Sequence, residues 1–507
     1  KFHCILIMKT IKSKLSLIFA KYVVNQNNSW KKKPLIFQKK IMLKLIDRAK
    51  NTSFGKDHSF HSIKNYEDFK KNIPIRDYEN LSNYIDLIKQ GKKNVLWPGQ
   101  PKYLCKTSGT TSGIKYIPLT SESIKNHLRP ARDAILSYLN ETKNSSIVSG
   151  KMIFLQGSPK LENENNLLIG RLSGIVAHHI PFYLKKNRLP TYESNCIEDW
   201  EKKVDAIVDE TKDQNMSLIS GIPPWVQMYF EKLTELSGKS IKELFPNFKL
   251  FIYGGVNYEP YKKTFERLIG GSVDGVEVYP ASEGFIAYQD SQKEKGMILC
   301  VNNGIFFEFI KTEDFFNQDA KRIWLENVEV GVDYVIILNT NAGLWGYNIG
   351  DTIKFVSKDP YRIIVSGRVK HFTSAFGEHV ISQEVEKSMN NTAKKHKAEI
   401  GGFHVAPLVN PKKGLPRHQW FVEFLKEPED LLAFSEDLDV FLQEQNTYYK
   451  DLISGSVLSK LDIIKIQKNG FNNYMKDIGK LGGQNKIPRL SNDRKIAENL
   501  IQYKKQK

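Results

Sequence analysis

The chain is poor in cysteine and has no CxxC pair. Its four cysteines, Cys4, Cys105, Cys196 and Cys300, are widely spaced along 507 residues. A disulfide framework or a structural zinc site needs cysteines at short, regular spacings. The spacing therefore argues against both a disulfide framework and a zinc site. It indicates a protein that works in the reducing interior of a cell.

The chain also lacks an apolar run long enough to cross a membrane. Residues 16–24 are apolar except for Lys21, and this stretch is too short for a transmembrane helix. It carries no small-residue cleavage site, so a signal peptide is not predicted. We expect an amphipathic packing helix here, a cytoplasmic protein and no membrane partner. Residues 1–7 precede Met8, and we expect them to be an upstream extension rather than part of a domain.

Acidic residues are outnumbered by basic ones. The chain has 75 Lys and Arg against 56 Asp and Glu, a net charge of +19. Such an excess can serve nucleic-acid binding. Lysine and asparagine are abundant along the whole chain, however, and no arginine-rich arm stands out. We attribute the charge to composition and expect no nucleic-acid partner, although a positive field would also tolerate a small polyanionic ligand.

The length and composition predict more than one domain with large cores. The chain is 40% hydrophobic and 11% aromatic, and it has no internal repeat. Short apolar strands alternate with helical stretches, which predicts an α/β architecture. On such sheets ligands gather at the carboxyl ends of the strands. The predicted strands are residues 152–155, 248–253, 275–279, 332–338 and 362–366.

Several helices are predicted from periodicity and from proline and capping signals. Residues 8–100 are mostly helical in pattern. Residues 121–139 form another helix, with Ser121 as N-cap and with Pro130 expected to kink or split it. A further helix starts at the prolines that follow Ile222. Past Arg368 the pattern changes to that of a small α+β domain, with helices at 383–389 and 428–445 and a strand at 419–424.

The most unusual segment is TSGTTSG at residues 107–113. Two glycines and five hydroxyl residues leave little to pack, but they supply the backbone N–H groups and hydroxyls that can wrap a phosphate chain. Extended residues flank this segment, so it is predicted as strand, loop and strand. The spacing does not fit a Walker loop, because Lys115 lies two residues past the second glycine and no helix follows directly. By itself the segment could equally be a plain turn.

Four charged residues follow predicted strands or lie in loops further along the chain. Glu283, an exposed carboxylate on a strand-end loop, could hold Mg²⁺ beside phosphates, or it is only a solvated loop residue. Asp351 follows Gly350 in a turn and could accept ribose hydroxyls, or it forms an Asx-turn. Arg368 could bind ribose or phosphate, or lie free on the surface. Lys486 could bring a cation to a transition state, or is simply solvated.

The order of these segments carries more information than any one of them. The chain runs TSGTTSG, YPASE at 279–283, YNIGD at 347–351, Gly367-Arg368 and a C-terminal lysine. This order resembles the adenylate-forming superfamily. The segments SGRVKHF at 366–372 and NKIPRLS at 485–491 are similar to the acyl acid amido synthetase family, whose plant members conjugate auxin and jasmonate to amino acids. The match is closest to its bacterial branch and extends from about Met8 over nearly the whole chain.

The resemblance implies a role for each matching position. Glu283 would bind Mg²⁺ and Lys486 would be the catalytic lysine, while Lys370 falls at the hinge. ATP and Mg²⁺ are the implied cofactors. The residues implied to bind the ATP phosphates are Ser108, Gly109, Thr110, Thr111, Ser112 and Lys115. Those implied to bind adenine and ribose are Gly254, Gly255, Val256, Tyr279, which would stack on the adenine, Ser282, Asp351 and Arg368.

The acid-binding residues of the plant enzymes lie in variable helices and have no match here. Arg129 and Arg132 are candidates for the acid by location only. Where plant members usually have Thr-Ser-Gly in the phosphate loop, this chain has Thr-Thr-Ser.

The resemblance also implies a fold and a reaction. Residues 8–367 would form a large domain of β-sheets flanked by helices that binds ATP and the acid. Residues 368–507 would form a small mobile α+β domain. The expected enzyme is a ligase that adenylates a carboxylic acid and passes the acyl group to an amine, for which an amino acid is expected. A coenzyme A ligase of the same superfamily and a nucleotide-binding scaffold without turnover are the alternatives. The sequence does not fix the oligomeric state, and a monomer is compatible with it.

Overall fold

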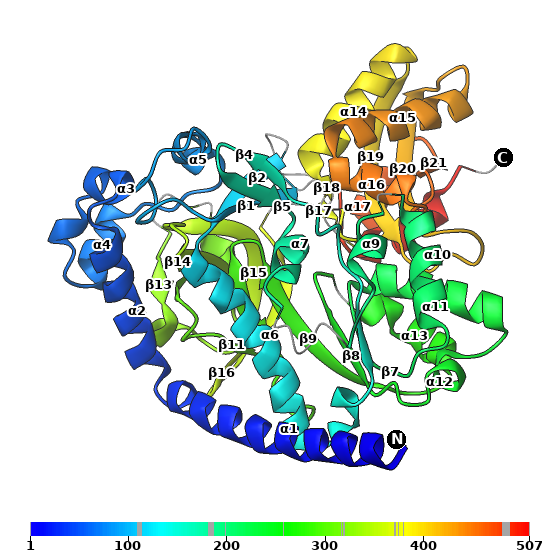
Figure 1. Ribbon diagram of the computed structural model, residues 1–507. Helices are drawn as coiled ribbons and strands as arrows, with labels where there is room; N and C mark the ends of the chain where they lie inside the picture. The colour runs from blue at the N-terminus through cyan, green and yellow to red at the C-terminus, as the bar shows by residue number, and fades with distance from the viewer. Residues whose placement is uncertain are drawn as a thin grey trace.

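The computed structural model describes residues 2–108, 114–180, 187–197, 199–256, 258–315, 317, 320–369, 372–373, 375–378, 380–478 and 487–505. Helices cover the N-terminal part of the chain, as the sequence predicts (Figure 1). They run along one side of the molecule and end at the first small sheet. These helices are α1 (Phe2–Lys31), α2 (Pro34–Ala49), α3 (Ser53–Asp57), α4 (Tyr66–Asn72) and α5 (Ser82–Lys89).

The hydroxyl-rich segment joins two paired strands. Strand β1 (Tyr103–Ser108) pairs antiparallel with β2 (Ile114–Leu119), which confirms the two predicted strands. These strands belong to a sheet of order β2-β1-β5-β4, completed by β5 (Leu167–Gly170) and β4 (Glu162–Glu164). The connecting residues 109–113 lie outside the described part of the chain.

Helix α6 (Ser121–Thr142) differs from the prediction at two points. Thr120, not Ser121, is its N-cap, because the Thr120 hydroxyl accepts from the Ser123 N–H in a reciprocal capping box. Pro130 does not split the helix, which continues past it for three turns. Pro130 itself is buried, and the apolar face of α6 packs on the large sheet, so tertiary packing offsets the hydrogen bond that proline cannot make.

Among the described residues, 12 strands form one large sheet of order β13-β12-β14-β15-β16-β11-β10-β9-β8-β7-β3-β6. From β6 to β9 neighbouring strands are parallel, and helices cover them as in an α/β fold. From β9 to β13 neighbours are antiparallel. The strands are β3 (Lys151–Phe154), β6 (Arg188–Leu189), β7 (Met216–Ser220), β8 (Leu250–Gly254), β9 (Asp274–Ala281), β10 (Gly284–Tyr288), β11 (Met297–Leu299), β12 (Ile305–Lys311), β13 (Ile323–Trp324), β14 (Asp333–Thr340), β15 (Tyr347–Lys358) and β16 (Tyr361–Arg368).

The helices between these strands pack on the parallel half of the sheet (Figure 1). The proline-initiated helix predicted after Ile222 is α11, which begins at Pro223. These helices are α10 (Trp200–Thr211), α11 (Pro223–Ser237), α12 (Ile241–Leu244) and α13 (Lys262–Ile269), while the short helix α7 (Leu172–Ala177) contacts β1 of the small sheet and α9 (Tyr192–Asn195) contacts α10.

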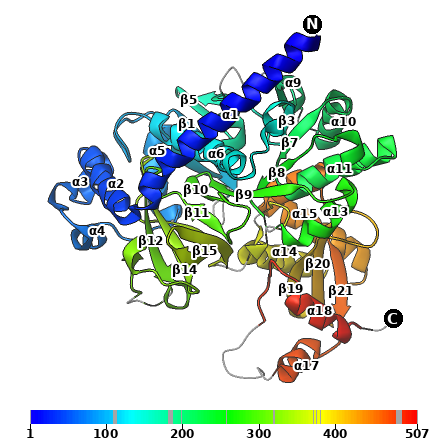
Figure 2. The same ribbon diagram turned by 90° about the horizontal axis from the view of Figure 1, so that it is seen from below.

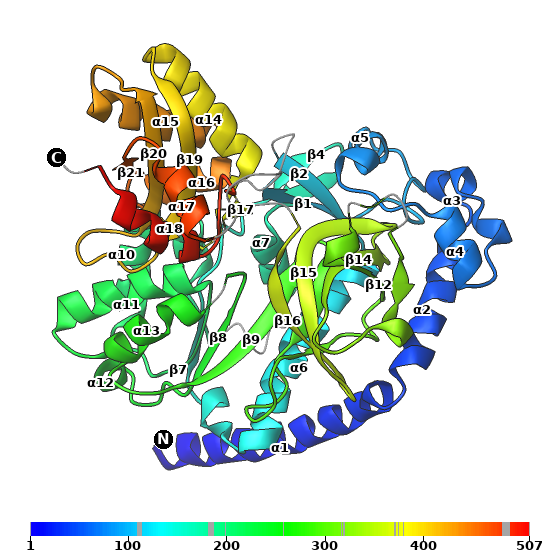
Figure 3. The same cartoon turned by 180° about the vertical axis from the view of Figure 1, so that it is seen from behind.

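The C-terminal part is a smaller α+β unit, seen from behind in Figure 3. Its three-stranded sheet packs helices on its faces, and its core is continuous with that of the parallel half, where Phe230 and Phe251 join Trp420 and Phe434 in one buried cluster. The elements are β17 (Phe372–Thr373), β18 (Val380–Ile381), α14 (Ser382–Lys395), β19 (Glu399–Leu408), β20 (Arg417–Lys426), α15 (Leu431–Gln445), α16 (Thr447–Ser454), β21 (Asp462–Ile466), α17 (Gly470–Asp477) and α18 (Lys495–Leu500).

A buried ion pair ties β13 to β12 in the antiparallel half. The Arg322 guanidinium pairs with Glu308, whose side chain is fully buried, and Asn339 Nδ2 also donates to Glu308 at 2.8 Å. We expect Arg322→Met to lower the free energy of unfolding by about 3–5 kcal/mol, because it leaves a buried carboxylate without its cation. Denaturant titration measures the change.

The matched control removes a surface lysine from the same sheet. Lys354 pairs with Asp333 at 3.1 Å with both side chains over 30% exposed. Lys354→Met should change the unfolding free energy by no more than about 1 kcal/mol. Equal losses in the two variants would contradict the account of the buried pair.

Candidate nucleotide and acid site

Glu283 lies in the tight turn between β9 and β10. Ala281 pairs with Gly284, so Ser282 and Glu283 alone form the turn. The expectation of an exposed carboxylate is wrong, because Glu283 is half-buried. Burial raises the pKa of Glu283, and the nearby positive charge of Lys115 works against that rise. The turn therefore holds a carboxylate in a dry setting that favours a cation beside it.

Lys115 reaches the same place from the phosphate-loop hairpin. It stands on β2 opposite Thr107 of β1, and its Nζ lies 5.7 Å from the centroid of the Tyr78 ring. Burial lowers the pKa of Lys115, while the charges of Glu283 and Glu79 work in the opposite direction. The hairpin and the β9–β10 turn thus bring opposite charges together at one end of the large sheet.

Asp351 is held by two donors, one on the neighbouring strand β16 and one on β9, further along the same sheet. Arg368 faces it across the β15–β16 pair and donates from Nε to Oδ1 at 2.5 Å. The Tyr279 hydroxyl on β9 donates to Oδ2 at 2.5 Å. Burial works to lower the pKa of Arg368, but Asp351, Tyr279 and Glu283 together raise it above its ordinary value. These three side chains form one hydrogen-bonded group.

The predicted turn at Asp351 is wrong. Asp351 lies inside the long strand β15, at an irregularity in its pairing with β14. Three residues of β15 stand where β14 has one between the pairs Ile337↔Asn348 and Val335↔Thr352. Gly350 has φ +86°, the left-handed conformation that such a bulge favours in glycine. The bulge turns Asp351 toward Tyr279 while leaving the strand intact.

The hydroxyl of Tyr279 has a partner that the sequence did not indicate. The resemblance implies that its ring stacks on adenine, and the structure adds the hydrogen bond to Asp351. Burial, followed by the charge of Asp351, raises the pKa of Tyr279 well above its usual range. Tyr279 is therefore a neutral donor at physiological pH and keeps Asp351 oriented.

Two glycines end the strand beside this group. A Cβ at Gly254 would come within 2.1 Å of the Val278 carbonyl oxygen, so β8 and β9 can approach only with glycine there. Gly255 follows with φ +82°. Both line a cavity of about 1420 Å³ that also reaches Ser282. Val256 packs against the apolar core instead.

The same cavity contains Arg129 and Arg132 in its wall. Arg129 Nη2 donates to the Asn302 carbonyl at 2.9 Å and to Asn303 Oδ1 at 3.0 Å. Arg132 Nη2 pairs with Asp133 at 2.7 Å. Both guanidinium groups already have acceptors, so each would share or exchange a partner to bind an acid.

Three contributors to this region were not predicted from the sequence. Cys105 Sγ donates to Ser282 Oγ at 3.2 Å, and burial raises the pKa of Cys105 to about 12, so it is a neutral thiol. Tyr448 of the C-terminal unit lines the cavity, with the Arg171 guanidinium 4.8 Å from its ring centroid. Arg171 also pairs with Asp451. No local motif marks these residues, because Cys105 meets Ser282 through the packing of β1 on the β9–β10 turn, and Tyr448 meets Arg171 through the packing of the two units.

Some predicted residues lie outside what the structure describes. These are Gly109, Thr110, Thr111, Ser112, Lys370 and Lys486, together with the side chain of Ser108. The described residues bring together Lys115, Ser282 and Glu283 with the Tyr279–Asp351–Arg368 group, and their roles remain expectations.

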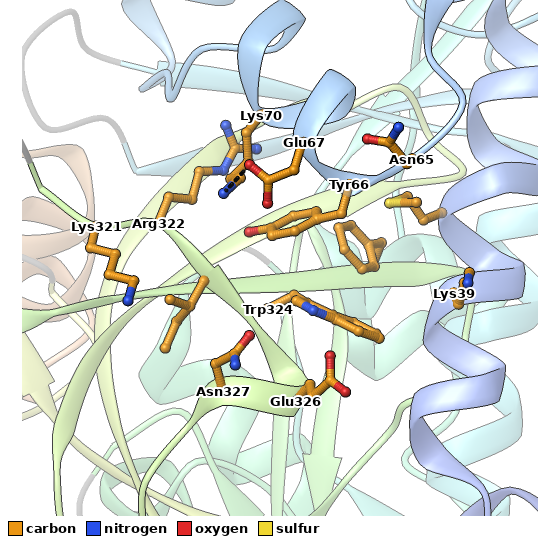
Figure 4. A pocket seen from close by; sticks show the side chains of 13 residues that line it. Lys39, Asn65, Tyr66, Glu67, Lys70, Lys321, Arg322, Trp324, Glu326 and Asn327 are labelled. Carbon is orange, nitrogen blue, oxygen red and sulfur yellow. Dashed lines mark ion pairs between the residues drawn. The ribbon is translucent and has the colours of Figure 1, made fainter.

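A second cavity of about 510 Å³ lies between α2, α4 and β13. Figure 4 shows the rings of Tyr66 and Trp324 at its floor and the Lys70–Glu67 ion pair at its edge. Lys321 also borders it. It contains none of the residues predicted to bind nucleotide, so the larger cavity is the better candidate for the reaction.

The carboxylate of Glu283 could serve as one ligand of a Mg²⁺ ion. The described residues contain no group of three His, Cys, Asp or Glu side chains that could hold a metal by themselves. Mg²⁺ needs only one or two carboxylates when phosphates and water supply its other ligands. The single half-buried carboxylate of Glu283 suits that arrangement.

Along the described chain, no helix has the length and apolar character to cross a membrane.

Comparison with solved structures confirms the expected fold. The AtGH3.15 acyl acid amido synthetase in complex with 2,4-DB superposes with a TM-score of 0.62 at 16% identity, covering 96% of each chain. A 2-hydroxyisobutyryl-CoA ligase in complex with 2-HIB-AMP and CoA gives a TM-score of 0.56 at 13% identity, over 93% of this chain and 92% of that one. A large α/β domain followed by a smaller C-terminal one is common to all.

Curated relatives are distant. The jasmonoyl-L-amino acid synthetase JAR4 of Nicotiana attenuata is 22% identical over 385 residues, covering 62% of this chain and 66% of the relative. The indole-3-acetic acid-amido synthetase GH3.15 of Arabidopsis thaliana is 24% identical over 410 residues, covering 64% of this chain and 66% of the relative. The chain thus aligns with just under two thirds of the length of these relatives.

Family models match three successive parts of the chain. The GH3 family N-terminal domain matches residues 24–222, the central domain 298–368 and the C-terminal domain 383–495. The first match contains the phosphate-loop hairpin, and the second contains Asp351 and Arg368. Together they cover most of the sequence in the order that the resemblance predicts, so this chain belongs to the GH3 family.

Proposed function

We propose that this protein is an ATP-dependent ligase that joins a carboxylic acid to an amino acid. One observation carries the proposal: the charges of Lys115, Asp351 and Arg368, on three strands, act on Glu283 in the β9–β10 turn. Ser282 of the same turn lines the cavity that Gly254 lines. The family membership and the relatives named as acid–amino acid synthetases support the same reaction.

The first step would form an acyl-adenylate. The acid's carboxylate oxygen attacks the α-phosphate of ATP, and pyrophosphate leaves. Hydroxyl-rich residues 108–112 and Lys115 would hold the phosphates, and Asp351 would accept the ribose hydroxyls. Glu283 would hold Mg²⁺, which neutralises phosphate charge. No covalent enzyme intermediate is needed, so catalysis is positioning plus relief of developing negative charge.

The second step would form the amide. The amine nitrogen attacks the acyl carbon of the adenylate, loses a proton, and AMP leaves with the electron pair of the broken acyl–oxygen bond. We place the domain boundary near residues 366–371, with Lys370 as hinge. Rotation of residues 368–507 would then withdraw Lys486 and open a path for the amine.

Two other functions fit the same fold. A coenzyme A ligase would share the adenylation step but transfer the acyl group to a thiol. A nucleotide-binding scaffold would bind ATP without turnover. The relatives named as acid–amino acid synthetases favour the amide-forming reaction over both.

The direct test is AMP release from ATP and a panel of carboxylic acids, with the twenty amino acids, with coenzyme A, or with neither. Release that depends on an amino acid is the expected result. Release that depends on coenzyme A would contradict the amide-forming proposal, and binding of ATP without AMP from any acid would favour the scaffold.

The lysine at position 486 gives a sharper prediction. Lys486→Ala should slow acid-dependent pyrophosphate exchange about a hundredfold or more, because one cation at the transition state typically contributes that much. ATP binding should change far less. Lys476→Ala, an exposed lysine at the end of α17, is the control and should exchange at the original rate. Unchanged exchange in the Lys486 variant would remove it from the mechanism.

The pH dependence of adenylation should report Glu283. Its pKa is raised, and only the carboxylate holds a cation, so the rate should fall as pH drops through that pKa. The positive charge of Lys115 lowers the pKa of Glu283. Lys115→Met should therefore raise that pKa further and shift the acidic limb of the pH–rate profile to higher pH. Lys239→Met, at an exposed position just after α11, is the control. An acidic limb that stays in place or moves to lower pH would contradict this coupling.

A further inference from the structure

Helix α1 presents large apolar side chains to solvent. Leu15 is 59% exposed, Ile18 67%, Phe19 46% and Tyr22 57%. Spacings of three and four residues put all four on one stripe of the helix. Single exposed apolar residues are ordinary, but four in one stripe mark an interaction surface.

An adjoining face of α1 fixes this stripe in place. Ala20, Val23 and Trp30 are buried, and Asn27 Nδ2 donates to Asp133 Oδ2 on α6 at 3.0 Å. Figure 2 shows that the N-terminal turns of α1 extend past the neighbouring elements. The stripe is therefore displayed on a helix anchored to the body of the protein.

The charged side chains of α1 itself have a single sign. The sequence has no Asp or Glu before Asp47, and residues 1–46 contain eleven lysines. Lys12, Lys14 and Lys21 are exposed on α1 itself. Lys31 is neutralised locally by Asp290 at 2.5 Å. An apolar stripe bordered by lysines complements a surface that has an anionic outer layer over an apolar interior.

We propose that α1 is an interfacial helix that docks this protein on a membrane surface rich in anionic lipid. Such a helix lies in the plane of the headgroups, with its apolar side chains among the acyl chains and its lysines at the anionic headgroups. The expectation of no membrane partner followed from the lack of a spanning segment, which docking of this kind does not require. The docking does not depend on the proposed reaction.

The apolar stripe of α1 lies at the wall of the large cavity. Phe19 lines the large cavity together with Lys12 and Ser16, and the same cavity reaches Gly254 and Ser282. Docking would bring that side of the cavity to the lipid, where acids with apolar tails partition. This second point rests on the proposed function.

Co-sedimentation of the full chain with vesicles tests the docking. We expect binding to vesicles of phosphatidylcholine mixed with phosphatidylserine, and little binding to phosphatidylcholine alone. Added salt should weaken it. Ile18→Glu/Tyr22→Glu should reduce partitioning at least about tenfold, because two apolar anchors are lost. Lys14→Gln/Lys21→Gln should reduce it by roughly fivefold per lysine.

The control is Leu236→Glu/Leu432→Glu, which changes two leucines that are 64% and 72% exposed on α11 and α15. It should bind vesicles like the original chain. No binding to either vesicle, equal binding to both, or equal loss in the α1 and control variants would overturn the proposal. So would concentration-dependent dimers, seen by light scattering, that only the Ile18/Tyr22 variant abolishes, because the stripe would then join two copies of this chain.

Discussion

The site depends on burying opposite charges where three parts of the chain meet. Lys115 comes from the β1–β2 hairpin, Glu283 from the β9–β10 turn, and Asp351 with Arg368 from the β15–β16 pair. A buried charge is costly unless an opposite charge or a hydrogen bond accompanies it. Each of these groups therefore favours the presence of the others, and their common position links the small sheet to both halves of the large one.

The large sheet supplies the geometry that this cluster needs. Strands β8 and β9 are parallel and approach closely at Gly254, which opens the cavity at their carboxyl ends. Strand β10 then returns antiparallel, so the turn that carries Glu283 lies at the same edge. The change from parallel to antiparallel pairing at β9 thus puts the Glu283 carboxylate, which we propose to hold Mg²⁺, beside the predicted nucleotide pocket.

Much of this arrangement could be predicted from the sequence, and the misses have local physical causes. Hydroxyl and glycine residues between two extended runs predicted the β1–β2 hairpin correctly. The cap of α6 was placed one residue late because Thr120 and Ser121 are chemically similar, and only the extended backbone of Thr120 decides between them. The bulge at Gly350 resembles a turn in sequence because both favour glycine at positive φ.

Long-range contacts were beyond sequence reasoning. Nothing near Tyr448 or Asp451 indicates that they meet Arg171 and the cavity, since that contact depends on how the C-terminal unit packs. The hydrogen bond of Tyr279 to Asp351 likewise joins β9 to the β15–β16 hairpin, across 72 residues of the chain. The family resemblance supplied these residues as separate positions, and the structure combines them into one group.

The most direct test of this account is a calorimetric titration of ATP, with and without Mg²⁺, into the original chain and into Glu283→Gln. The account predicts that Mg²⁺ strengthens ATP binding to the original chain and has little effect on the variant, while the variant still binds ATP through Asp351 and the phosphate loop. Equal Mg²⁺ dependence in both proteins would contradict the assignment of Glu283 and, with it, the charge cluster as the centre of the site.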